Sequence, residues 1–120
     1  MLLLLQRESS HVLFLHLRNV PMTTDAMIQK IAEYFKTQPV LKAWLFGSFS
    51  RGEETPLSDV DILVRYDDSA RISLMTISHM MGALEKTINR RVDLVEEGCL
   101  LPFAEKSVNR DKYLIYERTA

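Results

Sequence analysis

The spacing of apolar residues changes along this chain, and each spacing predicts one type of secondary structure. Thr24 can cap a helix whose first turn contains Asp25, and from there apolar residues recur at helical intervals until Pro39 ends the pattern. The apolar positions of this helix are Ile28, Ile31, Ala32 and Phe35. Two short apolar runs, at residues 41–46 and 60–66, then predict two strands.

The second half of the chain repeats these two spacings. Ile77, Met81, Leu84 and Ile88 lie on one apolar face of a helix, and residues 92–95 form a third apolar strand. A short helix is predicted over residues 102–109, whereas residues 113–116 fit either a helical end or an edge strand. This order predicts a two-layer α/β (α+β) domain with a small mixed sheet and helices packed on one face.

Residues 1–21 fit this domain poorly. Their apolar groups are interrupted by Arg7, Glu8 and His11, so no run reaches the roughly 18 residues that a membrane span requires. No small-residue cleavage site follows a continuous apolar core, as it would in a signal peptide. We therefore expect residues 1–21 to be an upstream extension, from a misassigned start or an accessory arm, and residues 22–120 to form the domain.

Composition narrows the class of protein. The chain has 120 residues, 47% of them hydrophobic, and a net charge of -1, which predicts one compact domain with one core and no association with a membrane. Its 15 Lys and Arg residues are scattered, so no basic groove for a nucleic-acid template is indicated. The single cysteine, Cys99, excludes an intrachain disulfide and fits a protein of the reducing cytoplasm.

Candidate chemistry is concentrated in three carboxylates. Asp59 and Asp61 project from the same face of an extended strand, because side chains alternate with a period of two, and their Cα atoms are roughly 6.6 Å apart. Asp93 interrupts the strand at residues 92–95 and completes a cluster if the two strands are neighbours. Adjacent carboxylates repel, and a hard divalent ion such as Mg²⁺ relieves that repulsion. Three of them can hold two ions about 3.5 to 4 Å apart.

A glycine turn precedes these carboxylates. Residues 43–46 are apolar and end at Gly47, where the backbone can turn tightly and bring N–H groups close to a phosphate. Ser48 adds a hydroxyl donor. Arg51 is either a solvated loop cation or a clamp for phosphate oxygens, and its residue type alone leaves both open.

These motifs resemble a known family. The segments GSFSRG at residues 47–52 and SDVDILV at residues 58–64 are similar to the signature of the minimal nucleotidyltransferases, the compact branch of the DNA polymerase beta superfamily. The resemblance covers about residues 24–117, and its one small departure is Ser50, where alanine is more usual after the aromatic residue.

The resemblance implies both a fold and a set of site residues. Residues 22–120 would adopt the polymerase beta-like nucleotidyltransferase fold. Gly47 and Ser48 correspond to the phosphate-binding pair, Asp59 and Asp61 to the metal ligands, and Asp93 to the third carboxylate, with Arg51 added modestly to the nucleotide site. All three acidic positions are present, which predicts an active enzyme that uses ATP with Mg²⁺ or Mn²⁺.

Function then divides into two classes. In the first, the chain is an enzyme that moves a nucleoside monophosphate from a triphosphate to a hydroxyl. The acceptor is a small molecule of the aminoglycoside type or, as we expect because no residues remain for a helical acceptor-binding domain, a protein. Relatives of this kind are commonly encoded beside HEPN proteins, helical RNases that they neutralise by adenylylating a tyrosine. In the second class, the chain is a non-catalytic antitoxin that occludes its partner. A homo-oligomer or hetero-oligomer is compatible with either.

Overall fold

The protein is described here by a computed structural model in which residues 22–119 are placed. The predicted extension at residues 1–21 lies outside the described residues. The elements, in chain order, are α2 (Thr24–Phe35), β1 (Val40–Phe46), β2 (Val60–Tyr66), α3 (Leu74–Ile88), β3 (Val92–Glu96), α4 (Pro102–Asp111) and β4 (Tyr113–Glu117). The three predicted strands and three predicted helices are all present, with bounds within a few residues of the expected ones.

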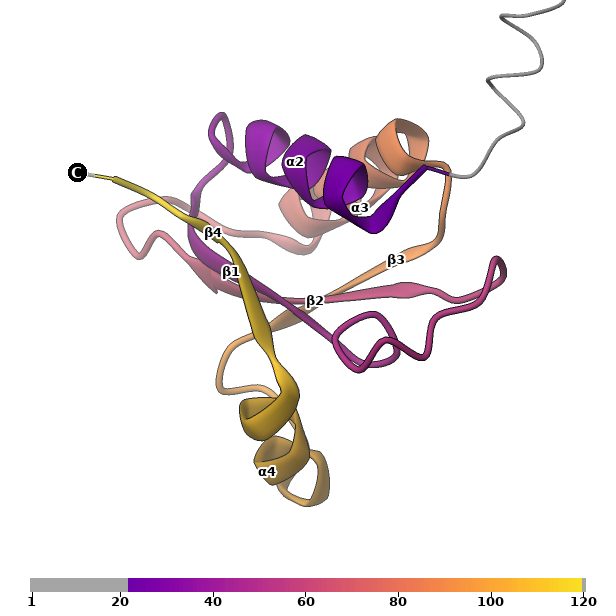
Figure 1. Cartoon of the computed structure of the whole chain (residues 1–120). Helices are drawn as coiled ribbons and strands as arrows, with labels where there is room; N and C mark the ends of the chain where they lie inside the picture. Colours follow the sequence, from indigo (N-terminus) through magenta and orange to yellow (C-terminus); the bar gives the residue numbers. More distant parts are fainter. Residues whose placement is uncertain (1–21, 120) are drawn as a thin grey trace, which may run out of the picture.

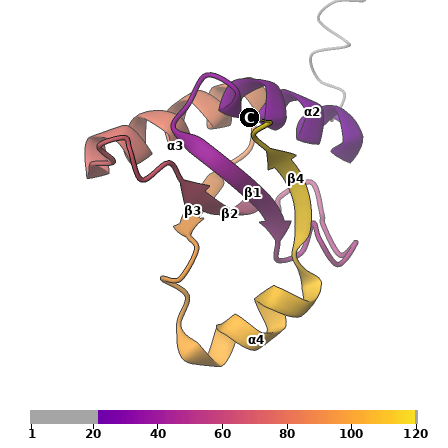
Figure 2. The same ribbon diagram turned by 90° about the vertical axis from the view of Figure 1, so that its left-hand side faces the viewer.

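A four-stranded mixed sheet forms the centre of the molecule (Figure 1). Its strand order is β3-β2-β1-β4; β1 is antiparallel to both of its neighbours, and β2 and β3 are parallel. The parallel connection runs through α3, as a crossover between parallel strands requires. Residues 113–116, whose structure the sequence left open, belong to the edge strand β4, which pairs with β1 (Figure 2).

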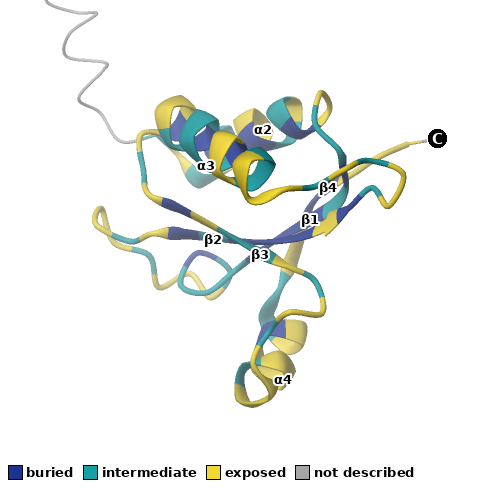
Figure 3. Cartoon of the chain, turned by 180° about the vertical axis from the view of Figure 1, so that it is seen from behind, coloured by how far each residue is buried: buried dark blue, intermediate teal, exposed yellow. Residues whose placement is uncertain are grey.

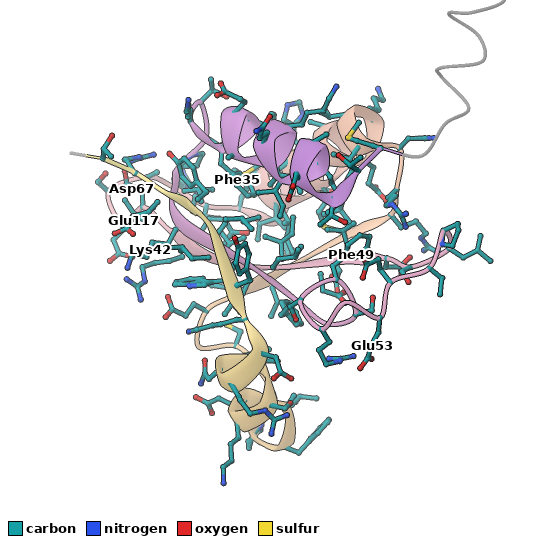
Figure 4. The ribbon with its side chains drawn as sticks, in the orientation of Figure 1. Phe35, Lys42, Phe49, Glu53, Asp67 and Glu117 are labelled. Atoms are coloured by element: carbon teal, nitrogen blue, oxygen red, sulfur yellow. The ribbon has the colours of Figure 1, made fainter. Side chains whose placement is uncertain are left out.

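Helices α2 and α3 cover one face of the sheet and build the main core there (Figure 1). Alternate residues of β2 point into this core, and Phe35 of α2 lies between its helix and the sheet (Figure 4). The fully or almost fully buried side chains of this core include Met27, Ile31, Phe35, Val60, Ile62, Val64, Met80, Leu84 and Ile88. The expected hydrophobic core between the helices and one face of the sheet is therefore present.

Two details of the helices differ from the sequence expectation. The N-cap of α2 is Thr23, whose side chain accepts a hydrogen bond from the N–H of Ala26, so Thr24 is the first helical residue rather than the cap. In α3 the sequence placed Met81 on the apolar face, but the buried methionine is Met80, and Met81 is only half-buried. Met80 and Met81 follow Ile77 at i+3 and i+4, so both positions fit one apolar stripe of the helix. The orientation of α3 on the sheet turns Met80 into the core.

Among residues 22–119, the opposite face of the sheet is covered by a helix only at one end. There Val108 of α4 packs with Trp44 of β1 and Leu63 of β2 in a second, smaller cluster. Figure 3 shows α4 below the sheet and mostly exposed, with one buried patch. The guanidinium of Arg65 and the ammonium of Lys112 lie over the Trp44 ring, 5.5 Å and 4.7 Å from its centroid. The predicted helical layer thus consists of α2 and α3, and α4 is an addition on the other side.

Within residues 22–119, no helix combines the length and apolar character needed to cross a lipid bilayer.

Candidate active site

The parallel pairing of β2 and β3 brings together the carboxylates predicted from sequence. Asp61 and Asp93 are register partners across these two strands. Asp59 lies directly before β2, two residues from Asp61, and therefore points to the same side of the strand. Side chains of register partners in neighbouring strands stand next to each other on one face of a sheet. The three aspartates are therefore neighbours on one face of the sheet.

This cluster lies on the face of the sheet that α2 and α3 leave uncovered. Val60 and Ile62 point into the main core, so Asp61 between them points to the opposite face. Leu63, two residues further along β2, packs under α4 on that same face. The carboxylates and α4 therefore occupy two adjacent parts of one surface, with Asp59 and Asp93 exposed and Asp61 half-buried.

The environment of Asp61 disfavours its negative charge. Partial burial raises the pKa of this carboxyl above its ordinary value, and the neighbouring charges of Asp93 and Asp59 raise it further. The guanidinium of Arg51 opposes this effect only in part. A nearby cation would stabilise the ionised form of a half-buried carboxylate that is repelled by two further carboxylates. A bound metal ion provides such a cation.

The three aspartates offer the type of ligand atom that a hard divalent cation prefers. Asp59, Asp61 and Asp93 provide carboxylate oxygens, the ligands that Mg²⁺ and Mn²⁺ prefer. Among residues 22–119, however, no three acidic, histidine or cysteine side chains converge closely enough to enclose an ion. Asp59 and Asp93 are both exposed, on the strand face that they share with Asp61.

Gly47 forms the turn that ends β1 beside the carboxylates. Its φ of +73° lies in the left-handed region, which glycine adopts without steric cost. A Cβ atom built on Gly47 would collide with Oδ2 of Asp61 and stand 3.3 Å from its Cγ. The backbone thus approaches the central carboxylate more closely than any other residue type allows.

The residues after Gly47 fold back on themselves in a compact turn. The hydroxyl of Ser50 donates to the Gly47 carbonyl at 2.9 Å, and the N–H of Glu53 donates to the Ser48 carbonyl at 2.9 Å. Phe49 points inward from this turn and is 7% exposed (Figure 4). The aromatic ring is part of the main core, and Ser48, directly before it, is half-buried.

Arg51 remains the least defined of the predicted site residues. Its side chain is exposed and forms an ion pair with Glu53, with 3.2 Å between Arg51 Nε and Glu53 Oε2. Glu53 itself points outward from the loop (Figure 4). The positive charge of Arg51 opposes part of the rise in the pKa of Asp61 and contributes least to the lowered pKa of Asp111.

Arg90 is the site residue that sequence reasoning missed. It lies in the turn between α3 and β3 and donates hydrogen bonds to the loop that precedes Asp59, most closely to the carbonyl of Ser58 at 2.9 Å and of Thr55 at 3.0 Å. Its guanidinium also lies over the Phe49 ring, 4.9 Å from the centroid. These partners are more than 30 positions away, so neither local spacing nor charge pattern reveals them.

One hollow among the described residues lies away from this cluster. An open cavity of about 880 Å³ runs along α2, and its lining includes Lys30, Glu33, Tyr34 and Thr87. None of the predicted site residues contributes to it. We assign no chemistry to this cavity, because the carboxylates and the glycine turn lie on the other face of the sheet.

A glycine-serine turn beside a cluster of strand carboxylates, on the open face of a small mixed sheet, defines the class of nucleotidyl-transferring proteins. In agreement, residues 29–120 match the family described as "Polymerase beta, Nucleotidyltransferase". The chain belongs to this family, and the expected enzyme class, a nucleotidyltransferase, is confirmed.

Relatives of known sequence carry more specific names. The chain is 38% identical over 73 residues to "Putative protein adenylyltransferase MJ1379" of Methanocaldococcus jannaschii, covering 60% of this chain and 71% of that protein. It is 32% identical to "Putative protein adenylyltransferase MJ0126" of the same organism, over 73% and 84% of the two chains. It is 39% identical to "Protein adenylyltransferase MntA" of Thermococcus cleftensis, over 56% and 66%.

Solved structures confirm the fold. The chain superposes with a TM-score of 0.62 on a protein described as "putative minimal nucleotidyltransferase", at 28% identity, covering 73% of this chain and 88% of the other. A chain from a toxin-antitoxin crystal structure with AMP-PNP gives a TM-score of 0.62 at 20% identity, over 81% and 76%. A chain from the complex of a tri-AMPylated Shewanella oneidensis HEPN toxin with an MNT antitoxin gives 0.59 at 17%, over 80% and 74%.

Proposed function

We propose that this chain is a metal-dependent protein adenylyltransferase that transfers AMP from ATP to a tyrosine hydroxyl of a helical HEPN-type RNase and thereby acts as its antitoxin. The observation that carries the proposal is the cluster of Asp59, Asp61 and Asp93 beside the Gly47 turn, since a protein that only occludes a partner has no need for three neighbouring carboxylates. The names of the relatives support protein adenylylation, and chains of this fold occur in complexes of HEPN toxins with MNT antitoxins.

The three aspartates would hold the divalent metal. When bound, the metal neutralises phosphate charge and lowers the pKa of the attacking hydroxyl. The glycine turn at Gly47 leaves room for the triphosphate close to Asp61, and the Ser48 hydroxyl donates a hydrogen bond to a phosphate oxygen. Asp93, exposed at the edge strand β3, faces the solvent side from which a protein acceptor arrives.

The proposed reaction is a single displacement. The tyrosine oxygen forms a bond to the α-phosphorus of ATP while the bond from that phosphorus to the bridging oxygen breaks, and pyrophosphate leaves. Asp93 accepts the hydroxyl proton. The acceptor oxygen must be held within about 3 to 3.5 Å of the phosphorus, which the partner protein achieves by docking on the open face of the sheet.

Mass spectrometry of the chain incubated with ATP, Mg²⁺ and the protein encoded by the neighbouring gene tests the proposal. We expect a mass increase of one or more AMP groups on the partner, loss of this product when the metal is chelated, and its return with Mg²⁺ or Mn²⁺. Asp61→Asn should abolish transfer, whereas Asp68→Asn, the same change at an exposed turn position after β2, should leave it intact. A tight complex with an unmodified partner that Asp61→Asn neutralises equally well would show an occluding antitoxin instead.

A further inference from the structure

The residues of the candidate site come from three separate segments that a single side chain connects. The glycine turn follows β1, Asp59 ends the long loop at residues 53–59, and Asp93 lies in β3. Arg90 stands three positions before Asp93 in the turn between α3 and β3, and its side chain reaches the other two segments. It therefore lies at the junction of all three parts of the site.

The contacts of Arg90 with the loop are directed at carbonyl oxygens. Its Nη1 donates to Ser58 at 2.9 Å and Thr55 at 3.0 Å, with Pro56 further away at 3.4 Å. Residues 55–58 already form a tight turn of their own, in which the N–H of Ser58 donates to the Thr55 carbonyl at 3.0 Å. Arg90 thus fixes a preformed turn in place, and the residue that follows this turn is Asp59.

The second contact of Arg90 is with the glycine turn. Its guanidinium lies 4.9 Å from the centroid of Phe49, a buried residue directly after Ser48. A planar guanidinium can present a face to an aromatic ring and its in-plane N–H groups to carbonyls at the same time. A lysine ammonium is a point charge without a face, so it cannot reproduce both contacts from this position.

We propose that Arg90 is a positioning residue of the nucleotide site, which holds the Ser58–Asp59 end of the loop against the Phe49 end of the glycine turn. This role rests on the proposed function, because the ligand for which Arg90 positions the site is the metal-bound triphosphate. Arg90 touches neither phosphate nor acceptor; it acts through the placement of Ser48 and Asp59.

The affinity of the free chain for ATP with Mg²⁺, measured by calorimetry without any acceptor, tests this role. Arg90→Lys keeps the charge and should weaken ATP binding about tenfold, the scale of one hydrogen bond to a charged group. Phe49→Leu, which removes the ring but keeps an apolar side chain, should weaken it in the same direction. Arg91→Lys is the matched control, since Arg91 is exposed and adjacent, and it should leave binding unchanged.

Amide hydrogen exchange separates positioning from general stability. In Arg90→Lys the N–H of Ser58 and of Glu53 should exchange faster, whereas amides in α3 and β1 keep their protection. Uniformly faster exchange in every element, with weaker binding only in proportion to unfolding, would overturn the positioning role. Equal losses in Arg90→Lys and Arg91→Lys, or unchanged ATP affinity in Arg90→Lys, would overturn it as well.

Failure of this inference is distinguishable from failure of the proposed function. A wild-type chain that binds ATP with Mg²⁺ but never modifies a HEPN-type partner contradicts protein adenylylation and leaves the binding data on Arg90 valid. A chain that transfers AMP normally and binds ATP equally well with Arg90→Lys contradicts only the role of Arg90. A wild-type chain without measurable ATP affinity would overturn both.

Discussion

Replacing Gly47 by alanine should damage the fold and the site together. Gly47 has a φ of +73°, and for a residue with a Cβ atom this conformation costs about 1–2 kcal/mol. In addition, the new methyl group would collide with the Asp61 carboxylate, which must turn away at a further cost of about 0.5–1.5 kcal/mol. Together these effects lower the free energy of unfolding by roughly 1.5–3.5 kcal/mol.

Gly52→Ala is the matched control for this experiment. Gly52 has a nearly identical φ of +68°, but a Cβ atom there would meet nothing within 4 Å. This variant therefore carries the backbone strain of about 1–2 kcal/mol without the collision. The difference between the two variants isolates the close approach of the Gly47 backbone to Asp61.

The assay combines thermal unfolding with ATP binding. In a domain of this size, each kcal/mol shifts Tm by about 4–8 °C, so both variants should melt lower and Gly47→Ala lowest. Only Gly47→Ala should lose affinity for ATP with Mg²⁺, because it alone moves Asp61. Equal Tm values for the two variants, with ATP affinity kept in both, would refute the idea that Gly47 is needed for contact with the carboxylate.

Three further predictions concern stability. Burial raises the pKa of Tyr66 to about 12, and in the described part of the chain its buried hydroxyl has no hydrogen-bond partner. Tyr66→Phe should therefore leave the free energy of unfolding unchanged or raise it by up to about 1 kcal/mol. The same variant should lose less stability than wild type as pH rises from 10.0 to about 12, which denaturant titrations at several pH values will measure. Hydrogen bonds from the Ser69 side chain and backbone, and then from Arg118, lower the pKa of Asp67. The ionised carboxylate therefore stabilises the fold at pH values above the ordinary pKa of 3.8, and this contribution is lost as the pH falls through the lowered pKa. Asp67→Asn should therefore lower Tm near neutral pH and flatten the acid side of the Tm profile, and parallel profiles for both proteins would contradict this. Gly82 lies inside α3 with open space around its Cα, so Gly82→Ala should raise the free energy of unfolding by about 0.5–1 kcal/mol, and a decrease in chemical denaturation would show a hidden packing constraint.

Much of the fold follows from the sequence because local and tertiary preferences agree there. The strands at residues 41–46, 60–66 and 92–95 are apolar, short and bounded by turn residues, and the structure places each within about one residue. The cluster of Asp59, Asp61 and Asp93 required one assumption, that the second and third strands are neighbours, and the parallel register confirms it.

The remaining features depend on contacts that a local pattern does not contain. Residues 113–117 are aromatic and apolar enough for either structure, and pairing with β1 decides for a strand. Glu54 lies in a polar loop, yet one of its carboxylate oxygens is buried, and the other accepts a 3.4 Å hydrogen bond from Thr24 in α2. Arg90 belongs to the same group, because its partners become neighbours only after the whole sheet has formed.

The position of β4 also has a consequence for how the protein is made. The last strand of the sheet pairs with the first, so β1 has an unpaired edge throughout synthesis until residues 113–117 leave the ribosome. That edge belongs to the strand VLKAWLF, whose single charged residue is Lys42. Charged residues on a strand edge oppose pairing with another chain, so this edge is weakly protected against self-association. Nascent or truncated chains that lack β4 therefore expose an apolar template for aggregation.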